Sequence, residues 1–495
     1  MSEGPRLQPQ KGLDLSVQHQ GFAYQLDAVE AVRNLEYAAL FHEQGLGKTK
    51  IGIDLALEWL REDAVDCVLF VTKRSLVQNW IEELGSHARI APAVLDQQHS
   101  ANFYVLNGAS RLLLAHYEVL KSEERRIAMF LRTRRVGAIL DESHKIKNPG
   151  ADLSAAFHRL SAGFAKRVIM SGTPVANRPY DIWSQIKFLD GGKALGDDFE
   201  AFKADLELGN DLWRDEGKRE AFEARLAAVF EMIRPFTVRE TKSSAGLSLP
   251  DKLIENVPVE LEAGQAELYR SYRELTRADV MAGGSVVDDD AEAILKRLLR
   301  LVQVASNPRL VDEGYEGTPA KLVALDQIID EAVGSGSKAI VWTSFVKNAE
   351  AIARHLERHG AVVVHGGLGM DARNDAVLRF KRDDRARILV ATPGAAKEGL
   401  TLTVANHAVF YDRSFSLDDY LQAQDRIHRI SQTQTCHVWN LVAKGTVDEW
   451  VDRLLSAKRL AAQLAQSDIE RSAYASEADY DFGRMVADIL NGEEK

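Results

Sequence analysis

The sequence predicts an α/β protein with two parallel sheets and a helical region between them. Three observations support this prediction. Short apolar runs alternate with amphipathic helical stretches over residues 16–181. The same alternation returns after residue 330, and between the two regions long charged helical patterns dominate. Continuous apolar strands that are separated by helices are typical of a parallel sheet with both faces covered.

The strands of each predicted sheet follow in order along the chain. The first sheet is expected from residues 38–41, 67–71, 112–116, 138–140 and 167–170, and the second from 339–343, 361–365, 388–391, 408–411 and 437–442. Strand patterns disappear between 182 and 330. We therefore predict a flexible N-terminus at 1–15, a first sheet domain at 16–181, helical protrusions and a linker at 182–330, a second sheet domain at 331–445 and a C-terminal helical segment at 446–495.

Composition narrows the class of protein. Hydrophobic residues make up 45% of the chain and charged residues 27%, which are globular proportions. No apolar run is long enough to span a bilayer and the N-terminus has no apolar signal core, so we expect a soluble, unsecreted protein without a membrane partner. The two cysteines lack a CxxC spacing, so we expect neither disulfides nor zinc. The net charge of −11 does not exclude a local basic groove for nucleic acid.

A phosphate-binding loop is predicted directly after the first strand. The strand at 38–41 runs into His42-Glu43-Gln44-Gly45-Leu46-Gly47-Lys48-Thr49. A glycine-rich loop that opens a helix directs backbone N–H groups and the helix dipole at phosphate. Lys48 is then expected on the β- and γ-phosphates and Thr49 on Mg²⁺. The same short match could come from an ordinary helix-starting turn, and the usual pattern has glycine where His42 stands.

A second motif supports the first. The apolar run 136–140 ends in Asp141-Glu142-Ser143-His144, which lies 93 residues after Lys48. Asp141 is expected to hold Mg²⁺ through water, and Glu142 to polarise the water that attacks the γ-phosphate. The alternative is a solvated acidic turn. Together the two motifs predict a site for ATP and Mg²⁺.

The ordered motifs resemble those of superfamily-two helicases, and most closely those of Swi/Snf-type ATPases. The resemblance is carried by Phe22-Ala23-Tyr24-Gln25, HEQGLGKT, DESHKIKNP, Ser171-Gly172-Thr173-Pro174 and the long run QAQDRIHRISQ at 422–432, and it spans about residues 22–460. It implies two RecA-like lobes, the first of which binds ATP, and a C-terminal helical brace. Ser344 follows Thr173 by 171 positions, and this long separation matches the helical protrusions of the family.

The resemblance also implies roles for individual residues. Gln25 would read the adenine, and Gly45, Gly47, Lys48 and Thr49 would cradle the phosphates. Ser171, Thr173 and His144 would couple nucleotide state to lobe movement. Arg426 and Arg429 would be arginine fingers with Gln422 beside them, because a guanidinium fork stabilises the charge that develops on the γ-phosphoryl group.

The chain departs from the family at three places. The family usually has Asp at His42 and Met at Gln44, and little functional loss is expected because the phosphate contacts are mainly from the backbone. The fifth motif, AAKEGLTLT at 395–403, is less glycine-rich than usual. This difference affects how that loop meets a nucleic-acid backbone.

Nucleic-acid contacts are expected from polar and basic residues that follow the strands. Ligands gather at the carboxyl ends of strands in open α/β sheets, and such groups suit phosphate contacts. The candidates are Lys73, Arg74, Lys145, Lys147, Ser344, Lys347, Thr401 and Thr403. Any single lysine among them could equally be solvated. Trp80 lies at helical spacing from Leu76 and Leu84 and is interpreted as a packing residue.

The sequence therefore predicts an ATP-dependent translocase that moves on double-stranded DNA and remodels DNA or protein–DNA complexes. Protein partners could supply its targeting. In a prokaryotic or viral setting the expected location is the cytoplasm, with the nucleoid. Two alternatives remain open: an RNA helicase of the same superfamily, and a nucleotide-gated nucleic-acid-binding scaffold without turnover.

Overall fold

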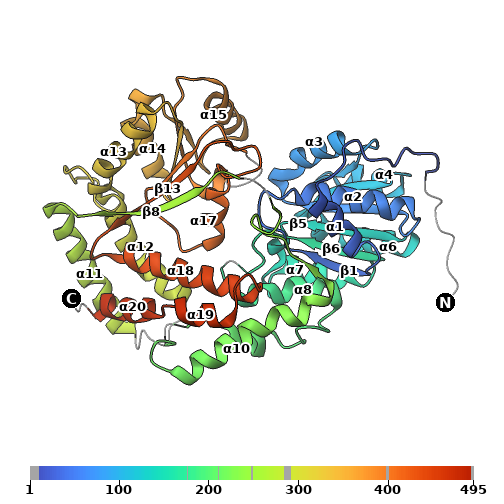
Figure 1. The fold of residues 1–495 in the computed structure, drawn as a ribbon, viewed down its shortest axis with the longest axis horizontal. Coiled ribbons are helices and arrows are strands. Elements are labelled where there is room, and N and C mark those ends of the chain that lie inside the picture. Colours follow the sequence, from blue (N-terminus) through green and yellow to red (C-terminus); the bar gives the residue numbers. More distant parts are fainter. Residues whose placement is uncertain are drawn as a thin grey trace. The chain divides into compact units, whose positions relative to one another are not determined.

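The chain divides into two compact units, each built on one sheet (Figure 1). The computed structural model describes residues 10–175, 177–209, 211–246, 249–283, 291–396 and 401–491. The first unit takes residues 1–206 and 225–247, and the second takes 207–224 and 248–495. Most of the segment predicted to be a flexible N-terminus lies outside the described residues. The other predicted domain boundaries stay predictions.

The first sheet is parallel throughout and has the strand order β3-β4-β2-β5-β6-β1-β7. Its strands are β1 (Tyr37–Leu40), β2 (Cys67–Thr72), β3 (Ala93–Leu95), β4 (Leu112–His116), β5 (Val136–Asp141), β6 (Lys166–Met170) and β7 (Thr237–Val238). The helices of this region are α1 (Ala23–Val32), α2 (Lys48–Arg61), α3 (Val77–His87), α4 (His99–Asn107), α5 (Tyr117–Ser122), α6 (Glu124–Thr133), α7 (Asp152–Ser161), α8 (Ile182–Asp190) and α9 (Phe199–Leu206).

Helices cover both faces of this sheet because its central strands are apolar on both sides. Every residue of β2 and β5 is buried. Helices α1, α2 and α3 share one core with the strands, and α8 packs on β1 and β6; Figure 1 shows α2 and α3 on one side of the sheet and α7 and α8 on the other. The strands β2, β5, β6 and β1 are consecutive in the sheet. Their carboxyl ends, where the predicted motifs begin, therefore meet at one edge.

The second sheet is also parallel, with the order β10-β11-β9-β12-β13-β8. Its strands are β8 (Lys252–Val259), β9 (Ala339–Trp342), β10 (Val362–Val364), β11 (Ile388–Ala391), β12 (His407–Phe410) and β13 (Cys436–Ala443). The helices of this region are α11 (Ala263–Gly283), α12 (Ala291–Ser306), α13 (Ala320–Gly334), α14 (Val346–His355), α15 (Met370–Arg382), α16 (Pro393–Ala396), α17 (Leu417–Gln424), α18 (Val447–Ala465), α19 (Arg471–Glu477) and α20 (Asp481–Asn491).

The prediction that strands disappear between 182 and 330 was wrong at two places. Strand β7 joins the first sheet beside β1, and β8 joins the second sheet beside β13. The reason is that β8 is an edge strand, which is largely exposed and carries polar residues and Pro258, so it lacks the apolar run of a central strand. Strand β3, at the edge of the first sheet, was also not predicted.

Helix α10 (Glu216–Ile233) begins among residues of the second unit and ends among residues of the first. Within the second unit, the C-terminal helices hold its beginning. Tyr480 donates a hydrogen bond to Glu223 Oε1 at 3.2 Å and lies 3.2 Å from the hydroxyl of Tyr474 in α19. The C-terminal segment therefore contacts the first half of α10 through Tyr480.

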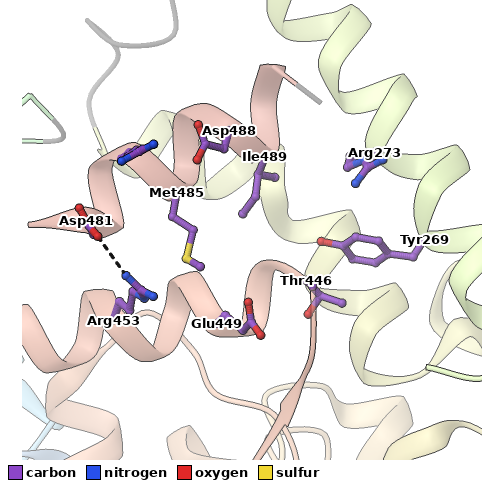
Figure 2. A pocket seen from close by; sticks show the side chains of 11 residues that line it. Tyr269, Arg273, Thr446, Glu449, Arg453, Asp481, Met485, Asp488 and Ile489 are labelled. Carbon is purple, nitrogen blue, oxygen red and sulfur yellow. Dashed lines mark ion pairs between the residues drawn. The ribbon is translucent and has the colours of Figure 1, made fainter. Parts of the chain in front are cut away.

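The same C-terminal segment forms a cavity of about 360 Å³ with α11 and the start of α18 (Figure 2). Arg453 of α18 pairs with Asp481 of α20 across it, at 3.5 Å. The lining residues are Tyr269, Arg273, Gly445, Thr446, Glu449, Arg453, Asp481, Arg484, Met485, Asp488 and Ile489. The lining contains three arginines and three acidic residues.

Both cysteine side chains are fully buried, Cys67 in β2 and Cys436 in β13. Burial raises the pKa of the Cys67 thiol to about 12. Within the part of the chain that the structure describes, no helix combines the length and the apolarity that crossing a bilayer requires.

A buried ion pair holds α13 to the start of α18 in the second unit. Lys321 is fully buried, pairs with Asp448 and donates to the carbonyl of Tyr411 at 3.0 Å. We expect Lys321→Met to lower the free energy of unfolding by about 3–5 kcal/mol, because it leaves the Asp448 carboxylate buried without its counter-charge. Chemical denaturation, followed by circular dichroism, measures this loss.

The matched control is Lys444→Met, because Lys444 also pairs with an acid, Glu260, but both side chains are exposed. This change should cost at most about 1 kcal/mol. Equal losses in the two variants would contradict the assignment of a stabilising role to the buried pair.

Candidate active site

The predicted phosphate loop is hydrogen-bonded to its own lysine, Lys48. Strand β1 ends at Leu40 and α2 begins at Lys48, with Gly45 and Gly47 at φ +85° and +70°. These left-handed conformations suit glycine and turn the loop tightly. Lys48 Nζ donates to the carbonyls of His42 at 2.9 Å and Glu43 at 3.2 Å. The lysine ammonium is thus held over the loop at the start of a 14-residue helix.

Burial explains how His42 is accommodated where the family has an acid. The side chain is 0% exposed, and burial lowers its pKa to about 4, with the charge of Lys48 acting in the same direction. The imidazole is therefore neutral at pH 7. A neutral side chain adds no second positive charge beside the lysine.

Gln25 of α1 lies against the same loop. Its Nε2 donates to the carbonyl of Leu46 at 3.1 Å, and its Oε1 accepts from the backbone N–H of Phe22 at 2.9 Å. A Cβ at Gly47 would lie 2.3 Å from Gln25 Nε2, so glycine is required there for space as well as for backbone conformation. The expected adenine contact of Gln25 stays a prediction.

The second motif begins where β5 ends. Asp141 is 8% exposed, and burial, with the charge of Glu142 next to it, raises the pKa of its carboxyl to about 6. The ammonium of Lys48 acts on this pKa in the opposite direction, so the lysine and the carboxylate are within electrostatic reach. The structure thereby brings the two strongest predicted site residues together.

Glu142 has a left-handed backbone with φ +54°, which is uncommon for a residue with a side chain. Among the described residues, its buried Oε2 has no hydrogen-bond partner, although His144 Nδ1 lies 3.3 Å away. A buried acceptor without a donor is costly in a folded protein.

The third motif lies against the first. A Cβ at Gly172 would lie 3.2 Å from Lys48 Nζ and 2.4 Å from Gln44 Cγ. Ser171, which follows β6 and is 0% exposed, accepts a hydrogen bond from the backbone N–H of Thr173 at 3.2 Å. Three sequence segments, after β1, β5 and β6, thus converge at one edge of the first sheet.

Gln185 of α8 is a site residue that the sequence reasoning missed. Its buried Oε1 accepts from Ser143 Oγ at 2.7 Å, and its Nε2 donates to the carbonyl of Pro174 at 3.0 Å. One amide therefore ties the second motif to the third. Its position in an amphipathic helix gave no signal in the sequence, because helical spacing alone accounts for it.

In the second unit, both predicted arginine fingers follow the carboxyl end of α17. Arg429 donates to Thr401 Oγ1 at 2.9 Å and to the carbonyl of Asp425 at 2.9 Å. Arg426 is 4% exposed, and its carbonyl accepts from Leu402 N at 3.0 Å. The motif thus packs on residues 401–403, the described end of the predicted fifth motif; residues 397–400 lie outside the described residues.

Gln422 lies in α17, and both oxygens of Asp418 accept from its Nε2, at 2.9 and 3.1 Å. This carboxylate fixes its side-chain amide. The roles of Gln422, Arg426 and Arg429 toward nucleotide stay predictions.

The predicted nucleic-acid residues differ in their surroundings. Three lysines form ion pairs: Lys145 with Glu118 at 3.4 Å, Lys147 with Asp181 at 2.8 Å and Lys347 with Glu313 at 3.0 Å. Lys73 is buried and Arg74 exposed. In the second unit, the backbone N–H of Ser344 donates to Asp412, and Thr403 shares a hydrogen bond with Ser431. Their contacts with nucleic acid stay predictions.

The close approach of Gly172 to Lys48 yields a test. We expect Gly172→Ala to weaken ATP binding, because the added methyl group must displace Gln44 and crowd the lysine, a strain of about 1–3 kcal/mol. Titration with a fluorescent ATP analogue measures the affinity. The control is Gly85→Ala on the exposed face of α3, where a Cβ meets nothing within 4 Å. Unchanged affinity in Gly172→Ala would contradict this packing.

Several known proteins are similar to this chain. An uncharacterized ATP-dependent helicase of Mycoplasma pneumoniae is 26% identical over 90% of this chain and 42% of its own length. The putative ATP-dependent helicase/translocase YwqA of Bacillus subtilis is 31% identical over 66% of this chain and 35% of its length. The human DNA repair and recombination protein RAD54-like is 26% identical over 87% and 63% respectively. This chain thus spans less than half the length of the first two relatives.

Among solved structures, the SWI2/SNF2 ATPase core of Sulfolobus solfataricus in complex with dsDNA is 26% identical, with 96% of this chain and 98% of that chain covered and a TM-score of 0.42. Two family descriptions match the sequence itself. Residues 18–310 match the SNF2-related domain, and residues 320–431 match the helicase conserved C-terminal domain. At the level of the family, the prediction of a helicase-type, ATP-dependent enzyme with two parallel-sheet lobes is confirmed. The chain belongs to the SNF2-related family.

Proposed function

We propose that this chain is an ATP-driven motor that moves on double-stranded DNA and remodels DNA or the protein–DNA complexes on it. The observation that carries the proposal is the convergence of three motif segments on one lysine. Lys48 is held by its own loop, Gly172 lies against it, and Asp141 is within reach of its charge. A sheet edge with these groups suits phosphoryl transfer from a nucleotide.

In the proposed reaction, Lys48 and the N–H groups of the loop bind the nucleotide phosphates. Asp141 and Thr49 would hold Mg²⁺, which characteristically takes only one or two protein oxygens and completes its shell with phosphates and water. The buried Asp141 carboxylate offers one such oxygen within reach of the Lys48 charge. Bound Mg²⁺ would neutralise the charge that develops on the phosphoryl oxygens.

Glu142 is proposed to orient the attacking water and to accept its proton. Its buried Oε2 lacks a hydrogen-bond donor among the described residues, and His144 Nδ1 lies 3.3 Å from that oxygen. The guanidinium groups of Arg426 and Arg429 are proposed to stabilise the transition-state charge.

Gln185 gives the proposed motor a physical link between hydrolysis and movement. A shift of Glu142 during the reaction acts on its neighbour Ser143, which is bonded to Gln185 and through it to Pro174 of the third motif. We propose that Ser171 and Thr173 respond to this shift, because they belong to the same short segment as Pro174.

DNA as the track is supported by the relatives and by the loops after the strands. One relative carries the name DNA repair and recombination protein, and another that of a chromatin-remodeling complex ATPase. Phosphate contacts from loop residues position a protein on a duplex without reading its sequence. A motor of this kind would work beside cellular DNA, with protein partners that supply its targeting.

The roles proposed for Lys48 and Glu142 predict different defects when each residue is replaced. Lys48→Ala should lose both ATP binding and hydrolysis. Glu142→Gln should keep ATP binding and hydrolyse about 10²- to 10⁴-fold more slowly, because an amide cannot accept the proton. Phosphate release and equilibrium binding of ATP measure the two effects. Loss of ATP binding in Glu142→Gln, or normal turnover in Lys48→Ala, would contradict these assignments.

The proposed track predicts which nucleic acid stimulates turnover. We expect double-stranded DNA to raise the ATPase rate more than single-stranded DNA or RNA. We also expect displacement of the third strand from a DNA triplex without unwinding of a tailed duplex. Binding should weaken steeply with salt, by about 0.9 in log–log slope for each neutralised phosphate.

Glu142→Gln serves as the control for movement, since it binds nucleotide without cycling. Stimulation by RNA alone would favour an RNA helicase, and nucleotide-dependent DNA binding without any phosphate release would favour a scaffold. Robust unwinding of the tailed duplex would show that the protein separates strands rather than only moving along the duplex. Each of these results would overturn the proposed track or action.

A further inference from the structure

Trp80 of α3 does more than fill the core of the first unit. The side chain is 1% exposed, and its ring packs on Phe70 of β2 with 4.9 Å between ring centroids. Its indole Nε1 donates a hydrogen bond of 2.8 Å to Asp141 Oδ2. Helical spacing explains why Trp80 is buried in the core. Its N–H also donates to the carboxylate that is proposed to bind Mg²⁺.

The Asp141 carboxylate is held from several elements. Its Oδ1 accepts from the backbone N–H of Glu142 at 3.0 Å, and Thr72 Oγ1 lies 3.4 Å from Oδ2, a longer contact than that of Trp80. The backbone carbonyl of Asp141 accepts from the buried hydroxyl of Tyr117 at 2.8 Å. Of the side-chain donors to the carboxylate, Trp80 makes the shorter hydrogen bond.

The indole N–H of Trp80 favours the ionised form of the Asp141 carboxylate. An indole N–H can only donate, so it favours the ionised carboxylate and occupies one lone-pair direction of Oδ2. It has no lone pair with which to compete for the metal or for its water. Outer-shell donors of this kind orient metal-binding carboxylates, and their loss typically lowers metal affinity by about 10- to 100-fold.

We propose that Trp80 is a positioning residue for the nucleotide-bound Mg²⁺, and that it acts by holding the Asp141 carboxylate through its indole N–H. This inference rests on the proposed function, because it assumes that Asp141 serves the metal. It predicts that the affinity for Mg²⁺ depends on one donor in the hydrophobic core, separately from the stability of that core.

Trp59 of α2 offers a matched control within the same core. It is 0% exposed, and its indole Nε1 donates to the backbone carbonyl of Arg33 at 3.0 Å. Trp59→Phe therefore removes the same group and the same volume from the same core as Trp80→Phe. It leaves the hydrogen bonds that Asp141 makes with Trp80, Thr72, Tyr117 and the backbone of Glu142 in place.

The experiment measures binding of a fluorescent, non-hydrolysable ATP analogue to the full chain at increasing Mg²⁺ concentrations and in EDTA. We expect Trp80→Phe to raise the half-saturating Mg²⁺ concentration by about 10- to 100-fold, with analogue affinity in EDTA unchanged. ATP turnover should recover at high Mg²⁺. Trp59→Phe should lower thermal stability by a similar amount and leave the Mg²⁺ dependence as in the wild type.

Asp141→Asn separates the two ways in which this inference can fail. If Asp141→Asn shifts the Mg²⁺ dependence and Trp80→Phe does not, or if Trp59→Phe shifts it equally, the role of Trp80 is overturned while the proposed metal site stands. If Asp141→Asn leaves it unchanged, the proposed metal site fails and the inference fails with it. Should Trp80→Phe fold poorly, Trp80→Met fills the space with a flexible side chain and gives the same comparison.

Discussion

A buried carboxylate whose proposed role needs its charge is the constraint on which the motif edge of the first unit depends. Burial favours the neutral acid of Asp141, and the charge of Glu142 adds to that tendency. The fold opposes both effects with donors from separate elements: the indole of Trp80 and the backbone N–H of Glu142. Lys48 adds positive charge from the neighbouring loop. These groups meet only because β2, β5, β6 and β1 are adjacent strands of one parallel sheet.

The fold was predictable wherever burial leaves a local pattern in the chain. Each central strand is apolar along its length and appears as a short run of hydrophobic residues, as in Leu112–His116. Edge strands carry no such run. Strand β8 pairs with β13 over eight residues, yet most of its side chains are exposed, so its pairing partner rather than its own apolarity makes it a strand. Contacts of this kind depend on residues far apart in sequence.

In the candidate site too, the residues that local sequence patterns predict differ from those that are defined by contacts distant in sequence. Lys48, Asp141 and Gly172 belong to contiguous motifs, and short motifs can be recognised because consecutive residues share one task. Trp80 and Gln185 bond to partners 61 and 42 residues away, and both lie in helices whose spacing already explains a buried residue. The sequence therefore indicated that Trp80 is buried and gave no indication of the hydrogen bond that its N–H makes. Hydrophobic periodicity predicts which side chains are buried, but it does not predict the hydrogen bonds that their polar atoms make.

The burial of both thiols makes the protein well suited to site-specific labelling. The chain contains two cysteines, one in the central strand β2 and one in β13, and both side chains are 0% exposed. At neutral pH almost no thiolate forms at Cys67, because its pKa is about 12, and maleimide reagents react with thiolates. A fluorophore pair could thus be attached through one introduced surface cysteine on each unit. The native side chains would stay in place while energy transfer between the dyes followed the nucleotide cycle.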